Sequence, residues 1–127
     1  KKHLDKEMKE RSVMKISKIA YLAGLFDGEG SVMYKQYFEN RKNRPNQSLV
    51  WRIRLEIAMT DKKTIKFIHD TLLVGWSGPR KVKPGYKPQW RWSTSFHGAK
   101  RVARLFYPYA ITKKEKLKKI VDHYEVE

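Results

Sequence analysis

The 127-residue chain contains no cysteine and few acidic residues, and each shortage narrows the kinds of protein that it can be. Without cysteine it can form no disulfide, no thiolate zinc site and no thiol nucleophile, so zinc fingers are excluded. Its apolar runs fall far short of the roughly 20 residues that span a bilayer, and its charged N-terminus differs from a signal peptide. We therefore expect a soluble, intracellular protein that is not secreted.

Positive charge dominates the composition. The chain has 29 lysines and arginines against 13 acidic residues, which gives a formal net charge of +16. The basic residues recur along the whole sequence rather than in one tail, so the folded domain needs a polyanionic partner. Nucleic acid is the favoured partner, because phosphates that a protein neutralises release condensed counterions. An anionic membrane surface is the competitor, and the absence of a basic amphipathic anchor disfavours it.

Apolar periodicity predicts a charged lead-in over residues 1–12 and a single α+β domain over residues 13–127. Because the loops within each pair of strands are too short for a parallel crossover, each pair must be an antiparallel hairpin. Helices should cover one face of the resulting sheet and leave the other face open. The predicted elements are helix 13–26, strands 31–38 and 49–59, helix 60–75, strands 76–83 and 89–96, and helices 99–106 and 111–124.

Strict alternation in residues 49–59 puts Trp51 and its apolar partners on the covered face, and Arg52 and Arg54 on the open face. The same alternation assigns Trp90 and Trp92 to the core rather than to stacking on bases. The open face is then a basic floor suited to the major groove of DNA. Candidate contacts to DNA are Ser31, Met33, Lys35, Tyr37, Arg41, Lys42, Arg44, Arg52, Arg54, Arg80, Lys81, Lys83, Gln89 and Arg91.

Residues 22–30, LAGLFDGEG, resemble the motif that names the LAGLIDADG homing endonucleases. The motif is altered at Phe26, Gly28 and Glu29, and the last of these keeps the carboxylate. Segments 57–62, 89–92 and 107–114 resemble later landmarks of the same family. The resemblance implies an α+β LAGLIDADG fold of order αββαββα, in which a four-stranded antiparallel sheet forms a concave DNA-binding face.

The resemblance also implies an activity, that of a site-specific double-strand DNA endonuclease that hydrolyses phosphodiester bonds. Glu29 and the Gly28 carbonyl would hold divalent metal, and hard oxygen ligands suit Mg²⁺, with Mn²⁺ or Ca²⁺ substituting in binding. Lys113 matches a basic residue that the family places around the metals. Asp61 stands where the family often has glutamine. Glu29, Lys113 and Asp61 are therefore the candidate catalytic residues. No membrane and no small-molecule cofactor is expected, and a bacterial, phage or organelle-encoded context fits.

A physical argument supports a homodimer. Ala20 and Gly24 lie one helical turn apart, so two copies of this helix can approach closely along small residues. Two Glu29 carboxylates would then meet, and such a like-charge pair favours cations between them. One chain has one motif, so cutting both strands needs a partner and a long pseudo-palindromic target. For Asp27, bonds to nearby backbone N–H groups are favoured over direct metal contact. The predicted dimer interface is Ala20, Ala23, Gly24 and Asp27.

Other functions are also compatible with the sequence. Members of the fold can act as non-cleaving DNA-binding regulators or as RNA-splicing maturases, and such roles usually tolerate loss of the acidic metal ligand. Glu29 is intact, which favours the enzyme. A basic, ribosome-associated RNA-binding domain would fit the charge alone, and the full motif argues against it.

Overall fold

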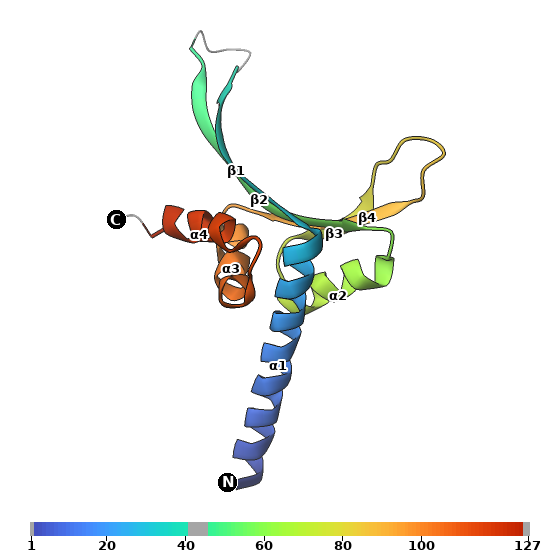
Figure 1. Cartoon of the computed structure of the whole chain (residues 1–127), viewed down its shortest axis with the longest axis vertical. Helices are drawn as coiled ribbons and strands as arrows, with labels where there is room; N and C mark the ends of the chain where they lie inside the picture. Colours follow the sequence, from blue (N-terminus) through green and yellow to red (C-terminus); the bar gives the residue numbers. More distant parts are fainter. Residues whose placement is uncertain (1, 41–45, 126–127) are drawn as a thin grey trace.

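The computed structural model describes residues 2–40 and 46–125, with side chains from Lys15 onward, and it shows one sheet with helices on one side (Figure 1). This arrangement confirms the α+β class and the predicted order of elements. In chain order they are α1 (Lys2–Glu29), β1 (Gly30–Glu39), β2 (Ser48–Met59), α2 (Lys62–Leu72), β3 (Trp76–Arg80), β4 (Gln89–Ser95), α3 (His97–Phe106), the 3₁₀ turn η1 (Tyr107–Tyr109) and α4 (Lys114–His123).

The sheet has four strands in the order β1-β2-β4-β3, and every neighbouring pair is antiparallel. Both predicted hairpins are therefore present, and β2 and β4 join them at the centre. In Figure 1 the β1–β2 hairpin rises on one side of the body and the β3–β4 connection rises on the other, while the helices lie below. The upper face of the sheet lies between these two arms.

The covered face of the sheet holds the apolar core, as the alternation predicted. Ile53, Leu55 and Ile57 of β2 are at most 1% exposed. Trp92 of β4 is fully buried, and its indole N–H donates a hydrogen bond of 2.9 Å to the Val74 carbonyl oxygen. A buried indole keeps its polar atom paired in this way.

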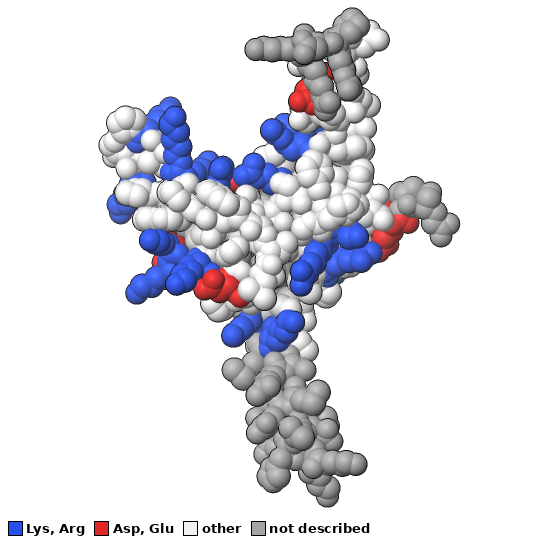
Figure 2. All heavy atoms as spheres, turned by 180° about the vertical axis from the view of Figure 1, so that it is seen from behind, with Lys and Arg blue, Asp and Glu red and all other residues white. Residues whose placement is uncertain are grey.

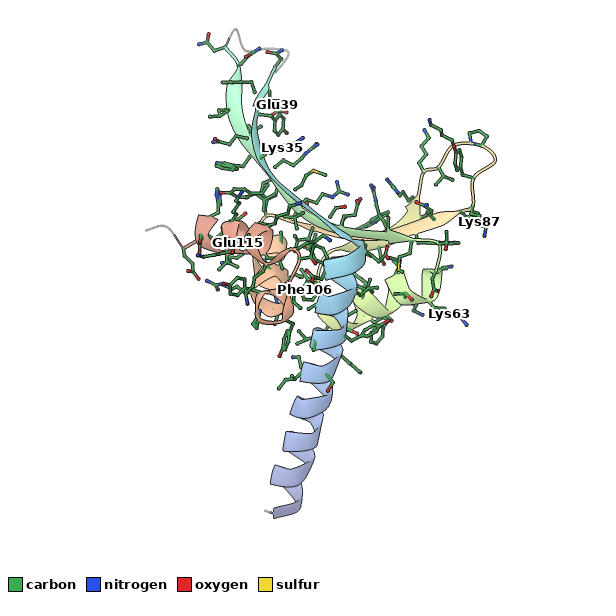
Figure 3. All side chains as sticks on the ribbon, viewed as in Figure 1. Lys35, Glu39, Lys63, Lys87, Phe106 and Glu115 are labelled. Atoms are coloured by element: carbon green, nitrogen blue, oxygen red, sulfur yellow. The ribbon has the colours of Figure 1, made fainter. Side chains whose placement is uncertain are left out.

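The remaining aromatic residues of the core follow the same plan. Trp51 and Trp90 are partly buried against the core, which confirms their predicted place on the covered face. The helices contribute Phe26 and Phe106, whose ring centroids lie 5.5 Å apart. In Figure 3 the Phe106 side chain lies among the helices beneath the sheet. This packing fixes the C-terminal half of α1 against the body of the domain.

Helix α1 differs from its prediction at both ends. It begins at Lys2, so the predicted lead-in forms the start of the same 28-residue helix, which extends away from the body in Figure 1. It continues past Phe26 to Glu29, and β1 begins at once with Gly30. A Cβ at Gly30 would overlap the ring and carbonyl oxygen of Phe26. The glycine that ends the helix is therefore Gly30, and Gly28 lies inside the last turn.

The predicted end of β3 and the predicted start of α4 were each wrong by three residues. Strand β3 ends at Arg80 instead of residue 83, because the chain then enters a turn in which the Tyr86 N–H bonds the Lys83 carbonyl oxygen at 3.2 Å. Gly85, with a φ of +91°, supplies the left-handed conformation that this turn requires. Helix α4 begins at Lys114 instead of residue 111, because the backbone N–H groups before it are bound by another part of the chain, described below.

No helix in residues 2–40 or 46–125 is long and apolar enough to cross a membrane.

Candidate functional site

The C-terminal end of α1 presents a set of oxygen atoms to solvent. Glu29 is the last residue of the helix and its side chain is exposed. The final carbonyl groups of a helix have no partner within that helix. The Glu29 carboxylate and the Gly28 carbonyl therefore form a donor set of oxygens alone, which is the chemistry that Mg²⁺ and Ca²⁺ prefer. Among the described residues, no group of three or more His, Asp or Glu side chains is arranged to hold a metal ion.

Asp27 ties the motif helix to the segment before α4. Its carboxylate accepts backbone hydrogen bonds from Ile111 at 3.0 Å, Thr112 at 2.8 Å and Lys113 at 2.7 Å. The Lys113 ammonium in turn donates to the Asp27 carbonyl oxygen at 2.6 Å. These four bonds place the Lys113 side chain at the end of α1, two residues before Glu29. They also agree with the backbone-bonding role that the sequence favoured for Asp27.

These contacts alter the acidity of Asp27. Burial raises the pKa of its carboxyl group, but the backbone hydrogen bonds from residues 111–113 and the charge of Lys113 together lower it below the ordinary value of 3.8. A group whose pKa is depressed on folding stabilises the fold above its unfolded pKa, and this stabilisation is lost as the pH falls through the folded pKa. The three hydrogen bonds from residues 111–113 to the Asp27 carboxylate, called the clamp below, should therefore weaken in acid, below a pH of about 4.

We expect Asp27→Asn to remove part of this acid sensitivity. The variant should be less stable than wild type by about 1–2 kcal/mol at neutral pH, as for loss of a helix-capping carboxylate. The difference should shrink as the pH falls from about 5 to about 3, because wild type then loses the same charge. Thermal unfolding followed by circular dichroism across this range measures both quantities. Asp70→Asn, at an exposed position on α2, is the matched control. Parallel pH profiles for Asp27→Asn and wild type would contradict the clamp.

A row of small residues runs along the exposed side of α1. Ala20, Gly24 and Gly28 follow one another at intervals of one helical turn, and both glycines are exposed. A Cβ at Gly24 or Gly28 would meet no other atom within 4 Å. Packing within the chain therefore does not require glycine at either position. Ala23 is placed differently from its prediction, since it is fully buried in the core of its own chain.

The open face of the sheet carries most of the predicted DNA contacts on strands. Met33 lies opposite Arg54 and Lys35 lies opposite Arg52, and directly opposed residues share a face. Figure 3 shows Lys35 extending from the sheet on the side away from the helices, and Figure 2 shows Lys and Arg groups between the two arms as well as over the helices. The predicted residues that share this face are Ser31, Met33, Lys35, Tyr37, Arg52, Arg54, Arg80, Gln89 and Arg91.

The structure describes only some of the loop residues that were predicted to contact DNA. Lys81 and Lys83 are exposed in the connection after β3, where they extend the basic surface beyond the sheet. At the base of that connection Arg80 donates a hydrogen bond of 2.9 Å to the Gln89 side-chain carbonyl. Three further candidates, Arg41, Lys42 and Arg44, lie outside the described residues.

Asp61 caps helix α2. Its carboxylate accepts from the Thr64 hydroxyl at 2.7 Å and from the Lys63 backbone N–H at 3.0 Å. The Thr64 hydrogen bond is the main reason that the pKa of Asp61 lies below its ordinary value. Both carboxylate oxygens thus serve the helix terminus that the sequence predicted. The catalytic role of Asp61 stays a prediction.

Sequence reasoning did not single out Glu56, at the centre of the open face, or Trp76, on the edge strand β3. The Glu56 carboxylate pairs with Arg54 at 3.0 Å and with Arg91 at 3.5 Å. The Arg91 guanidinium lies 5.3 Å from the centre of the Trp76 ring. Alternation alone put Glu56 on the basic face beside Arg54, but its pairing with Arg91 depends on the register of β2 against β4, which the sequence does not reveal.

Comparison with solved structures shows which known proteins share this architecture. The homing endonuclease I-CvuI, in complex with its target in the presence of calcium, matches with a TM-score of 0.68 at 18% identity, over 87% of this chain and 67% of its own. The archaeal intron-encoded homing endonuclease I-Vdi141I, complexed with DNA, matches with a TM-score of 0.66 at 15% identity, over 83% of this chain and 65% of its own. The LAGLIDADG homing endonuclease I-GzeII, in complex with its DNA target, matches with a TM-score of 0.59 at 20% identity, over 84% of this chain and 35% of its own.

The chain has the LAGLIDADG homing endonuclease fold.

The resemblance drawn from the motif is thus confirmed at the level of the fold. No protein-family model matches the sequence, and neither does any curated protein. The chain spans about two thirds of the length of I-CvuI and I-Vdi141I, and about one third of the length of I-GzeII. In this chain the motif that names the fold forms the last turns of α1 and the entry into β1.

Proposed function

We propose that the protein is a site-specific double-strand DNA endonuclease that works as a homodimer with Mg²⁺. One observation carries the proposal: in a fold shared with homing endonucleases, the motif helix ends in an exposed carboxylate at Glu29. A binding protein on the same fold has no need of that group. Solved neighbours are complexes with DNA, and I-CvuI has been crystallised with calcium and with magnesium.

The exposed side of α1 supports the dimer. Gly24 and Gly28 face open space in the single chain, and glycine in a helix interior costs about 1 kcal/mol relative to alanine. A second α1 packed along this row explains the residues, because small side chains let two helix backbones come close. Two helices related by a two-fold axis would end side by side and bring their Glu29 carboxylates together.

The same geometry supports metal binding. Two carboxylates brought together repel one another, and a divalent cation between them removes the repulsion. Glu29 and the Gly28 carbonyl of each chain would hold the metal. When bound, the metal would supply a more acidic water and stabilise charge on the scissile phosphate. Asp27 holds the segment of Lys113 against α1, which keeps an ammonium group beside the phosphate that is to be cut.

The open face supplies the DNA-binding surface. Arginines and lysines on β1, β2 and β4 lie between the two raised arms, where a duplex can be received. Strand residues would contact base edges in the major groove, while the loop residues Lys81 and Lys83 would contact phosphates. A homodimer presents this surface twice, so the target is a long pseudo-palindrome.

A cleavage screen on randomised DNA tests this function. Purified protein is incubated with Mg²⁺ and a plasmid library, and linear products are sequenced. We expect Mg²⁺-dependent cuts in both strands at one family of pseudo-palindromic sites. Selective binding without any cut would support the regulator instead. Binding and processing of intron RNA without DNA cleavage would support the maturase.

A further inference from the structure

The centre of the open face holds one acidic residue among arginines. Glu56 of β2 lies opposite Ser31 of β1 on one side and Ser93 of β4 on the other. Its Oε1 atom lies 3.0 Å from Nη2 of Arg54 and 3.5 Å from Nη1 of Arg91. A single carboxylate thus links arginines from two different strands.

Arg54 and Arg91 are partly buried as well as paired with Glu56. Arg54 also donates from Nη2 to the Ser93 hydroxyl at 3.2 Å. The Nε atoms of both Arg54 and Arg91 are buried and have no hydrogen-bond partner. The Glu56 side chain is 19% exposed, against 27% for Arg54 and 35% for Arg91. Partial burial reduces solvent screening, so these charges attract each other more strongly than an exposed pair does.

Trp76 closes the cluster on the β3 side. Its ring is about half exposed, and the Arg91 guanidinium lies over it at 5.3 Å. A Cβ on the neighbouring Gly78 would come within 2.6 Å of Trp76 Cζ2, so the indole lies directly across that glycine. The ring therefore acts as a wall that limits where the Arg91 side chain can move.

We propose that Glu56 is a specificity-determining residue of the endonuclease proposed above, on which this inference rests. Glu56 orients Arg54 and Arg91 as a fixed pair toward the base edges, and each half-site then requires guanine beneath that pair. Arginine donating to the O6 and N7 acceptors of guanine is the commonest base-specific contact in the major groove. Holding the guanidinium in place before DNA arrives lowers the entropy lost on binding.

The contacts favour a positioning role for Glu56 over direct reading of a base. Its Oε1 atom already pairs with both guanidinium groups, so this oxygen is engaged by the protein and not by a base. Glu56 engages Nη2 of Arg54, which also bonds Ser93, and Nη1 of Arg91. This leaves Nη1 of Arg54 and Nη2 of Arg91 to donate to a ligand. Arg52 on the same strand differs from Arg54 in its contacts, because its guanidinium lies over the Tyr37 ring at 5.6 Å and does not pair with Glu56.

Selection of randomised duplexes by wild type and by Glu56→Gln tests the proposal. It is carried out in Ca²⁺, so that only binding is measured. Wild type should enrich guanine at defined positions of each half-site. Glu56→Gln should lose about 5- to 100-fold of that preference. Its affinity for random DNA should stay equal or rise, because the variant has one negative charge fewer.

Two further variants make the result specific. Glu115→Gln removes the same charge from an exposed position on α4, which lies on the covered side of the sheet, and should leave the preference unchanged. Arg54→Lys keeps the charge of the pair but removes the planar guanidinium and its fixed donor directions, so it should also lose preference for guanine.

The possible failures can be told apart. If wild type selects guanine and a folded Glu56→Gln selects it equally well, this inference is wrong while the proposed function stands. An equal loss of affinity for all sequences would show that Glu56 is merely structural. If wild type selects no sequence at all, the proposed function and the inference fail together.

Discussion

Glu29→Gln is expected to reduce Mg²⁺-dependent double-strand cleavage by at least about 100-fold, the scale on which a single charge-stabilising group acts in catalysis. The amide keeps the size of the side chain but removes the negative charge that attracts the metal. Because Glu29 is exposed and has no described contact to the sheet, DNA binding should remain. Cleavage is measured as linearisation of a plasmid that carries the selected site, and binding is measured separately in Ca²⁺.

Glu115→Gln is the matched control for that experiment, since it removes an exposed glutamate from the first turn of α4. It should cut at the wild-type rate. Retention of the full cleavage rate by Glu29→Gln would rule out this residue as the metal ligand. Loss of cleavage together with loss of all binding would instead assign Glu29 to DNA recognition.

Gly24→Leu is expected to separate the homodimer into single chains. A Cβ at this position meets no other atom within 4 Å, and leucine should favour the helix by up to about 1 kcal/mol. Against a second α1, however, the same side chain would force the two backbones apart. We therefore expect a folded monomer by sedimentation and circular dichroism, with no double-strand cleavage at concentrations where wild type is dimeric.

Lys118→Leu provides the control, because it adds the same side chain to an exposed helical position on α4. It should stay dimeric and active. If Gly24→Leu remained a dimer that cut DNA normally, the row formed by Ala20, Gly24 and Gly28 would not be the interface. The homodimer would then have to form through another surface.

The covered and open faces of the sheet could be predicted because β2 alternates without interruption. Ile53, Leu55 and Ile57 are all buried, and the arginines between them are not. A period of two residues has no other structural explanation, and a slip of one residue would bury the arginines. The two hairpins followed from the short loops between strands, which permit only antiparallel pairing.

Contacts between distant parts of the chain could not be predicted from the sequence. The clamp joins Asp27 to residues 111–113, which follow it by 84 to 86 positions in the sequence. Nothing near Asp27 identifies these partners. This same clamp explains why α4 starts later than its apolar pattern suggests. The pairing of Glu56 with Arg91 likewise depends on the register between β2 and β4, which no local pattern specifies.

The spacing of small residues on α1 identifies a stripe but not the direction in which it faces. Ala20 and Gly24 lie on the side turned away from the core, whereas Ala23 lies among Leu22 and Phe26 inside it. Positions 23 and 24 differ by about 100° around a helix, so neighbouring small residues serve different purposes. Only the packing of α1 on the sheet shows which of these residues is buried in the core of its own chain.

In the proposed enzyme, two copies of Glu29 hold metal at the axis of a dimer. Anomalous diffraction from Mn²⁺, in crystals of the protein bound to its selected duplex, tests it most directly. We predict manganese between two α1 termini, within about 2.2 Å of a Glu29 oxygen from each chain. Manganese bound elsewhere, or Glu29 side chains that lie far apart on the duplex, would contradict the account.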